Sequence, residues 1–400
     1  MQKPIYLDNA ATTKLSEHAL NEMMPFLKEN FGNPSSIYSI GRQNQKVIEQ
    51  SRAIIADCLG AAPEEIYFTS GGSEADNWAI KGVAFNKLRQ GKNHIITTVF
   101  EHHAVLHTVN ALKKQGFDVT LIPIDSQGLV NPDDIDNAIT DKTSIVSVMY
   151  ANNEIGTIMP IKEIGAICKK RGVIFHTDAV QAVGHVDINV KEENIDLLSL
   201  SAHKFHGPKG IGALYCRKGI NLQNLIEGGA QERSRRAGTE NVPGIVGMAT
   251  ALKDACSNIN EINSRLIPLQ KKLITELSKI ERSRLNGHPT RRLPSNVNFS
   301  FEGVEGESLL LMLDNKGICA SSGSACTSGS LDPSHVLLAL GLKHEIAHGS
   351  LRLSMSEETT EEEIDYAISV IPEILVRLRA MSPLWERIKM NDKSERAEKI

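Results

Sequence analysis

Leu198-Ser-Leu-Ser-Ala-His-Lys-Phe-His-Gly-Pro-Lys-Gly-Ile-Gly212 is the segment from which the architecture and chemistry of this chain are predicted most directly. Its apolar residues end at Ser201, and Lys204 follows next to His203, before a turn rich in glycine. A strand end followed by such a turn is where α/β enzymes place reactive groups. A single loop lysine is far more often a solvated charge than a nucleophile, so the interpretation of Lys204 depends on the rest of the chain.

A second strand end of the same kind lies upstream, in Val173-Ile-Phe-His-Thr-Asp-Ala-Val-Gln181. Its strand residues end at Thr177, and Asp178 and Gln181 follow. A strand-end carboxylate 26 residues before a strand-end lysine (204 minus 178) suits a pyridine cofactor. The carboxylate would keep the pyridine nitrogen protonated, and the lysine would carry the cofactor aldehyde. The two segments together predict a site for a pyridine cofactor that carries an aldehyde.

Between residues 95 and 195 the chain alternates apolar strands with helical segments. The predicted strands are residues 95–99, 119–122, 144–149 and 173–175, and the predicted helices are residues 105–114, 132–139 and 161–171. This alternation indicates an α/β fold with a mostly parallel sheet between helices. Polar residues follow four of the strands, at residues 101–103, 152–154, 178–181 and 201–204, so we expect them at one edge of the sheet.

A glycine pair marks another strand-to-helix turn. The strand predicted at residues 66–70 is followed by Gly71, Gly72 and Ser73, which open a helix. Backbone N–H groups and the helix dipole at such a start favour an anion. A glycine pair is more often only a turn, but in this chain we assign Gly72 and Ser73 to the cofactor phosphate.

The segment Cys319-Ala-Ser-Ser-Gly-Ser-Ala-Cys-Thr-Ser-Gly-Ser-Leu-Asp-Pro-Ser-His335 consists almost entirely of small and polar residues. Such a composition cannot pack a core and predicts a mobile, exposed loop. Cys326 lies in its middle, where a thiol is a poor structural choice and a good nucleophile. The other five cysteines lie in helical or strand patterns and are expected to pack: Cys58, Cys168, Cys216, Cys256 and Cys319.

The composition excludes several other classes of protein. The 400 residues are 41% hydrophobic, which is enough for a large core in one or two domains. A net charge of −4 provides no basic surface for nucleic acid, and no apolar run approaches the ~18 residues of a membrane span. The start of the chain lacks the apolar core of a signal peptide, and six cysteines without paired spacing indicate a reducing compartment. We therefore expect a cytoplasmic protein.

These motifs together resemble the pyridoxal-phosphate-dependent cysteine desulfurases of fold-type I, in the group with a long cysteine loop. The resemblance covers residues 6 to about 385, and the string Ser-Ser-Gly-Ser-Ala-Cys-Thr-Ser-Gly around Cys326 is its most specific part. One departure is Ser73, where the family more often has threonine; the hydroxyl is kept. The resemblance implies conversion of L-cysteine to L-alanine with a persulfide left on Cys326. The nitrogenase-associated branch is most similar, and the housekeeping branch stays an alternative.

The resemblance also implies roles for individual residues. Lys204 would hold the cofactor and shuttle protons, Asp178 would bind the pyridine nitrogen, and Gln181 would bind the ring oxygen. His102 would lie over the ring and act as an acid or base. Phosphate ligands would be Ser73, Ser201, His203 and Thr239 of the partner subunit, the last from a glycine- and arginine-rich loop at residues 228–241. Asn153 and Arg352 would hold the substrate carboxylate.

The same resemblance predicts the organisation of the chain and its partners. A large cofactor-binding domain would span residues 15–262, and a small α+β domain with the cysteine loop would comprise residues 1–14 and 263–385. A mostly parallel seven-stranded sheet would lie in the large domain, and residues 386–400 would form a charged, frayed tail. The expected partners are a second copy of the chain, in a homodimer, and an iron–sulfur scaffold protein that accepts sulfur.

Three other functions and one other motif need consideration. An aminotransferase would use Lys204 and Asp178 without needing Cys326, a selenocysteine lyase would share the fold, and a non-catalytic sulfur carrier would lack the lysine. The segment His344-Glu-Ile-Ala-His348 matches a zinc-protease pattern. Gly341 and Gly349 leave that segment too short for a helix that aims both histidines inward, so we expect a chance match and no metal.

Overall fold

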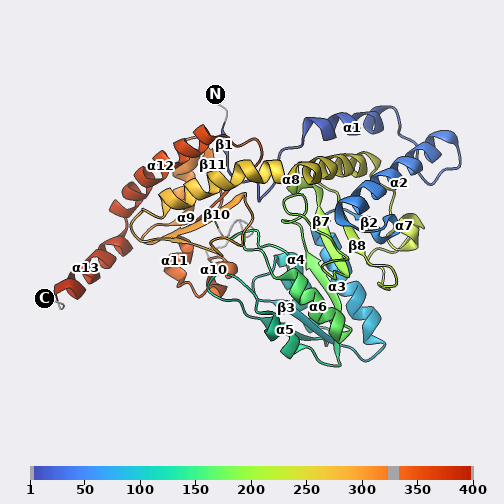
Figure 1. Ribbon diagram of the computed structural model, residues 1–400, viewed down its shortest axis with the longest axis horizontal. Helices are drawn as coiled ribbons and strands as arrows, with labels where there is room; N and C mark the ends of the chain where they lie inside the picture. The colour runs from blue at the N-terminus through green and yellow to red at the C-terminus, as the bar shows by residue number, and fades with distance from the viewer. Residues whose placement is uncertain (1–3, 323–332, 398–400) are drawn as a thin grey trace.

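The computed structural model describes residues 4–322 and 333–397, and a seven-stranded mixed sheet lies at its centre (Figure 1). In spatial order the strands are β2 (Ile66–Thr69), β8 (Gly212–Cys216), β7 (Leu197–Ser201), β6 (Ile174–Asp178), β5 (Thr143–Ser147), β3 (His94–Thr98) and β4 (Asp118–Ile122). Only β8 runs against the others, because its pairings with β2 and β7 are antiparallel and the remaining pairings are parallel. The predicted fold class is confirmed.

Helices cover both faces of this sheet, as the strands require. Every residue of β3, β5 and β7 is buried, so these strands need apolar cover on two sides. One face packs against α3 (Gly72–Leu88) and α4 (His103–Lys113). The other face packs against α2 (Ser39–Leu59), α5 (Pro132–Ala138), α6 (Ile161–Arg171) and the first half of α8 (Val242–Leu277).

A second core lies in the last third of the chain. It is built on the antiparallel sheet β9 (Ser283–Leu285), β10 (Asn296–Phe301) and β12 (Ser350–Ser354), with α9 (Gly306–Asp314), α12 (Glu361–Ala380) and the strand pair β1 (Ile5–Tyr6) and β11 (Ile318–Cys319). The second half of α8 contributes Leu266 and Leu273 to this core, so one long helix extends from one part of the molecule to the other (Figure 1). The predicted domain boundary at residue 262 falls inside α8.

The short elements bring one correction to the sequence prediction. They are α1 (Glu17–Lys28), η1 (Pro63–Glu65), η2 (Ala202–Lys204), α7 (Gln231–Ser234), α10 (His335–Ala339), α11 (His344–His348) and α13 (Pro383–Ala397). The tail predicted to fray is the helix α13, and the prediction was wrong because Trp385 is buried under the Arg379 guanidinium, 4.0 Å from the ring centroid. Within the described residues, no helix has the length and apolar character needed to cross a membrane.

The first residues of the chain connect the two parts of the molecule. We call residues 7–13 the N-terminal arm. At its start, the Ser354 amide of β12 donates to the Leu7 carbonyl at 2.7 Å. At its end, the Thr13 amide donates to the His203 carbonyl in η2 at 2.9 Å. The arm therefore passes from the small sheet to the edge of the large sheet.

A buried ion pair fixes the segment around α7. The Arg52 guanidinium of α2 contacts both carboxylate oxygens of Glu232, at 2.8 and 2.9 Å, and the Phe68 amide donates to the same carboxylate at 2.9 Å. Glu232, Arg233 and Ser234 all have positive φ, which is strained for residues with a Cβ. The ion pair therefore compensates the strain of this turn.

We expect Glu232→Ala to lower the free energy of unfolding by about 3–5 kcal/mol, since the buried Arg52 guanidinium then keeps only the half-exposed Glu49 as an ionic partner among the described residues. Denaturant unfolding of the purified protein measures the change. The control is Lys279→Ala, which removes an exposed pair with Glu276 at 2.6 Å and should cost less than about 1 kcal/mol. Equal effects of the two substitutions would contradict the prediction.

Candidate active site

A cavity of about 340 Å³ lies where the strands β6 and β7 end, between the sheet edge and the N-terminal arm. Of the predicted site residues, those that line it are Gly72, Ser73, His102, Asn153, Asp178, Gln181, Ser201, His203, Lys204 and Arg352. The prediction that polar strand ends meet is confirmed, because β3, β5, β6 and β7 are parallel and present their carboxyl ends on one side. Arg352 reaches the cavity from the small sheet.

Lys204 ends the short helix η2, directly after β7. Its Nζ donates hydrogen bonds to the carbonyls of Ala10 and Ala11, at 2.6 and 2.8 Å. Both carbonyls belong to the N-terminal arm, and both residues line the cavity. The amine is thus held by backbone oxygens at the point where a cofactor aldehyde would need it.

Asp178 is the last residue of β6 and is buried. Burial raises the pKa of its carboxyl group, while His102, the Val180 amide and Lys204 lower it. The Val180 amide donates to Asp178 Oδ1 at 3.0 Å. A buried carboxylate whose charge is supported by a nearby amine can hold a protonated pyridine nitrogen.

His102 caps the N-terminus of α4, and this role orients its ring. Its Nδ1 accepts from the Ala104 amide at 3.1 Å, which assigns the proton of the neutral ring to Nε2. Burial lowers the pKa of His102, Asp178 raises it and Lys204 lowers it. The ring is therefore neutral at neutral pH and faces the cavity.

The start of α3 forms the anion-binding end of the cavity. Gly71 has a φ of +152°, a conformation that residues with a side chain rarely adopt. A Cβ at Gly72 would lie 2.5 Å from Val180 Cγ2, so only glycine fits between α3 and β6. Ser73 and Ser201 line the same end. A helix start with exposed backbone N–H groups and two hydroxyls suits a phosphate.

His203 and Gln181 connect this end to the N-terminal arm. His203 Nδ1 lies 3.1 Å from Thr12 Oγ1, and burial with the charges of Lys204 and Lys209 lowers its pKa to about 4. A neutral His203 can donate to a phosphate oxygen. Gln181 Nε2 donates to the Ala10 carbonyl at 2.9 Å.

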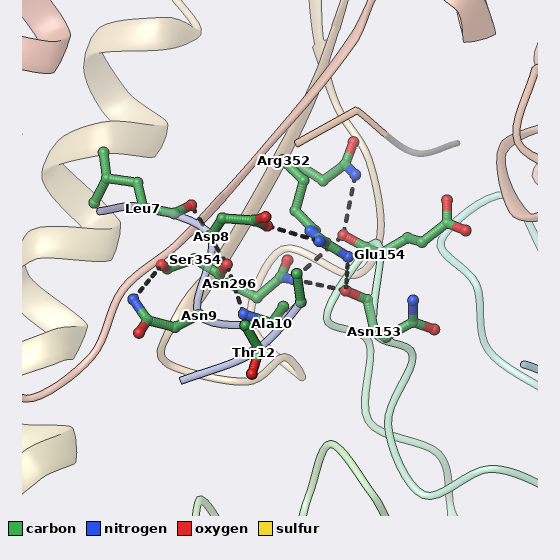
Figure 2. Close-up of polar contacts among 12 residues, drawn as sticks. Leu7, Asp8, Asn9, Ala10, Thr12, Asn153, Glu154, Asn296, Arg352 and Ser354 are labelled. Atoms are coloured by element: carbon green, nitrogen blue, oxygen red, sulfur yellow. Dashed lines mark hydrogen bonds and ion pairs between the residues drawn. The ribbon is translucent and has the colours of Figure 1, made fainter. Parts of the chain in front are cut away.

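Arg352 and Asn153 also line the cavity, and Figure 2 shows the Arg352 guanidinium next to the Asn153 carbonyl. Arg352 lies on β12 with 2% of its surface exposed. Its Nη2 donates to Asp8 Oδ1 at 2.8 Å, and its Nη1 donates to the Asn153 carbonyl at 3.1 Å. A buried guanidinium that lines the same cavity as the lysine is suited to a substrate carboxylate.

One predicted site residue in the described part of the chain does not line this cavity. Thr239 is exposed on the loop after α7. Cys326 lies outside the described residues, so its predicted role stays a prediction. Among the described cysteines, Cys168 and Cys216 are buried, which raises the pKa of each thiol to about 12 and keeps both protonated. Cys58, Cys256 and Cys319 are half-buried.

Three buried polar residues near Asp178 were given no role in the site from the sequence, although one of them, Glu101, lies in the polar segment 101–103. Asp76 lines the cavity; burial and the Asp178 charge raise the pKa of its carboxyl group, and its Oδ1 has no hydrogen-bond partner among the described residues. Burial raises the pKa of Glu101 to about 8 and lowers that of His176 to about 3. A signal existed for Asp76, since it follows Gly72 by four residues and so shares its helix face.

The residues around the cavity fit pyridoxal phosphate. A buried carboxylate, a primary amine and a neutral histidine meet at one end of the sheet, and the glycine-bounded helix start lies beside them. The buried Asp76 Oδ1 makes no hydrogen bond among the described residues and lies 3.6 Å from His176 Nε2, which is consistent with a further partner at this site.

The histidine pattern His344–His348 forms the five-residue helix α11, with the two rings edge to face at a centroid distance of 4.7 Å. In the part of the chain that the structure describes, no three potential ligands of the kinds His, Cys, Asp and Glu are placed to hold a metal ion.

The chain is similar to known proteins along nearly its whole length. The profile of the aminotransferase class-V family matches residues 5–367. The chain is 58% identical to the cysteine desulfurase IscS of Clostridium botulinum, over 98% of this chain and 99% of that protein. It is 59% identical to the cysteine desulfurase IscS of Methanosarcina thermophila, over 96% of this chain and 94% of that protein. A solved structure described as a NifS-like protein has a TM-score of 0.88 and 39% sequence identity to this chain, and the match covers 93% of this chain and 99% of that one.

The raised pKa of Glu101 predicts a pH-dependent stability. Between about pH 4.5 and 8 the unfolded chain releases this proton and the folded protein keeps it, so stability falls as pH rises through this range. Glu101→Gln cannot ionise. We therefore expect the melting temperature of the variant minus that of the unsubstituted protein to increase by about 2 °C or more from pH 5 to pH 8.

Thermal unfolding without added cofactor at several pH values measures this difference. The exposed Glu373→Gln is the control and should show a constant difference. A difference for Glu101→Gln that does not change with pH would show that Glu101 is ionised in the folded protein.

Proposed function

Since the chain belongs to the aminotransferase class-V family and is a pyridoxal-phosphate-dependent cysteine desulfurase, we propose that it converts L-cysteine to L-alanine and transfers the sulfur to Cys326. The observation that carries the residue assignment is the meeting of Lys204, Asp178 and Arg352 at one cavity. Asp178 ends β6 and Lys204 follows β7 in the large sheet, whereas Arg352 lies inside β12 of the small sheet, and each has a separate task.

When bound, pyridoxal phosphate supplies a ring that accepts electrons from the substrate. Asp178 would bind the pyridine nitrogen and keep it charged, and Gln181 would bind the ring oxygen. Gly72, Ser73, Ser201 and His203 would bind the phosphate. These assignments rest on the places of the residues around the cavity.

Lys204 Nζ would carry the cofactor and then move a proton to and from the substrate α-carbon. Its bonds to the Ala10 and Ala11 carbonyls would hold the freed amine near the substrate. His102, neutral and with its proton on Nε2, would act as an acid or base beside the ring. Arg352 and Asn153 would hold the substrate carboxylate.

Cys326 would take the sulfur by direct attack. Its thiolate forms a bond to the substrate sulfur, the substrate Cβ–S bond breaks, and the electron pair of that bond stays with Cβ, which a proton then converts to the methyl group of alanine. The products are L-alanine and a persulfide on Cys326. The proposed acceptor of this sulfur is an iron–sulfur scaffold protein in the cytoplasm, supported by the resemblance of the cysteine segment to long-loop desulfurases.

A homodimer is part of the proposal. Large apolar side chains between α1 and α2 face solvent, with Phe31 77% and Ile37 88% exposed and Tyr38 also exposed. A cluster of exposed apolar side chains of this kind indicates an interaction surface. Thr239, which is exposed and does not line the cavity of its own chain, would reach the phosphate of the partner subunit.

The proposed chemistry is tested with Lys204→Ala and Cys326→Ala. The unsubstituted protein should be yellow and should release sulfide and alanine from L-cysteine with a thiol reductant. Lys204→Ala should lose both products and the lysine-bound absorption band. Cys326→Ala should keep the band and release sulfide at least about 100-fold more slowly.

The matched control is Cys216→Ala, a buried cysteine remote from the cavity lining, which should keep the activity. Full desulfuration by Cys326→Ala would assign the sulfur to another acceptor. Transfer of an amino group without sulfide release would favour an aminotransferase, and a strict preference for selenocysteine would favour a selenocysteine lyase.

The dimer is tested with Ile37→Asp, which places a charge in the apolar surface. We expect light scattering to show a monomer. We also expect weaker binding of the cofactor, since Thr239 of the partner subunit would no longer contact the phosphate. Val376→Asp, an exposed apolar residue on α12, is the control and should stay dimeric. Monomers for the unsubstituted protein, or dimers for Ile37→Asp, would refute this interface.

A further inference from the structure

The contact between Asp8 and Arg352 gives the N-terminal arm a role in substrate recognition (Figure 2). The two residues are 344 positions apart in the chain, and Asp8 Oδ1 accepts from Arg352 Nη2 at 2.8 Å. Asp8 is the only carboxylate that forms an ion pair with Arg352 among the described residues. Arg352 is almost wholly buried, so this pair is the main compensation of its charge.

The arm is held in register against β12, which places Asp8 beside Arg352. Asp8 forms a parallel bridge with Ser354, and Ser354 Oγ accepts from the Ala10 amide at 2.9 Å. Asn9 Nδ2 donates to the Ser354 carbonyl at 3.0 Å. Arg352 and Ser354 lie two positions apart on one strand, so their side chains share the face that meets the arm.

A second element fixes the other side of the guanidinium. Arg352 Nη1 donates to the Asn153 carbonyl, and Asn296 Nδ2 on β10 reaches the carbonyls of Asn153 and Glu154, at 3.5 and 3.2 Å. A planar guanidinium held at two nitrogens from two different elements cannot rotate. Its orientation is therefore set before a substrate arrives.

The held guanidinium keeps donors for a ligand. Of its five N–H groups, Asp8 and Asn153 take one each, and Nε is buried without a hydrogen-bond partner among the described residues. Arg352 lines the same cavity as Lys204. A buried, unpaired donor next to a cavity indicates a missing acceptor, and a carboxylate satisfies it.

Glu154 is the other acidic residue near Arg352, and it is not suited to this task. Burial raises the pKa of its carboxyl group to about 7, against the effects of Ser334 and Arg352. Its carboxylate instead accepts from Ser334 Oγ at 2.5 Å. Asp8 alone combines direct contact with the guanidinium and a place on the arm.

We propose that Asp8 is a positioning residue, whose carboxylate orients the Arg352 guanidinium so that its remaining N–H groups meet the α-carboxylate of the substrate. Asp8 thereby sets the preference of the site for an α-amino acid over an amine without a carboxylate. The inference rests on the proposed function, because it takes Arg352 as the group that binds the substrate carboxylate.

The test compares two small ligands of the holoenzyme, L-alanine and ethylamine, which differ by the carboxylate alone. Isothermal titration gives the dissociation constant of each, and their ratio measures carboxylate recognition apart from catalysis. We expect Asp8→Ala to lower the selectivity for L-alanine about tenfold, because the binding of L-alanine becomes weaker and the dissociation constant of ethylamine stays the same. The KM for L-cysteine should rise by a similar factor, with kcat changed less than about threefold.

Two further variants separate positioning from general stability. Asp8→Asn keeps an oxygen acceptor at the same place and should retain most of the selectivity. The control is Lys14→Ala, which removes a solvent-exposed pair with Glu358 just after the arm and should leave the ratio unchanged. Asp8→Ser, too short to reach the guanidinium, replaces Asp8→Ala if that variant does not fold, and melting temperatures of all variants are recorded.

A selectivity ratio in Asp8→Ala that stays the same or rises would overturn the proposal, whatever the melting temperature does. A loss of selectivity in Asp8→Asn as large as that in Asp8→Ala would also overturn the proposal, since the acceptor oxygen would then have no orienting effect. Failure of the proposed function has a different signature: the unsubstituted holoenzyme itself would not prefer L-alanine to ethylamine.

Discussion

The two hydrogen bonds from Lys204 Nζ to the carbonyls of Ala10 and Ala11 join the beginning of the chain to the edge of the large sheet. The rest of the site depends on this junction. The same arm pairs with β12 through Ser354 and contacts Arg352 through Asp8, so it closes the cavity between two separately packed cores. Without the arm, the amine and the guanidinium would lose the element that contacts both of them directly.

Burial shifts the pKa values of the carboxyl groups around this junction. Asp76, Glu101 and Asp178 are three buried carboxyl groups whose pKa values are all raised by burial. Only Asp178 has Lys204 and His102 among the groups that lower its pKa, whereas the Asp178 charge raises the pKa of both other carboxyl groups. Lys204 and His102 therefore favour the ionised form of Asp178 over that of the other two carboxyl groups, at the place where a cationic ring nitrogen would bind.

Much of the fold and of the candidate site was predicted from local patterns. The apolar runs that end at Ser201 and Thr177 located β7 and β6, and the polar residues after them line one cavity. The helix predicted from Gly72 onward is α3. By contrast, residues beyond 385 carry charge with little apolar pattern, and the burial of Trp385 under Arg379 is a long-range contact that no local pattern shows.

The sequence alone therefore determined the elements and the chemistry that each strand end presents, because strand period, glycine turns and residue type are properties of short segments. The tertiary structure decided which distant groups meet. Asp8 has no local feature that marks it, and its contact with Arg352 follows from the register of the arm on β12. The burial that raises the pKa of Asp76 likewise arises only when the helix α3 packs on the sheet, since desolvation depends on everything that surrounds a group.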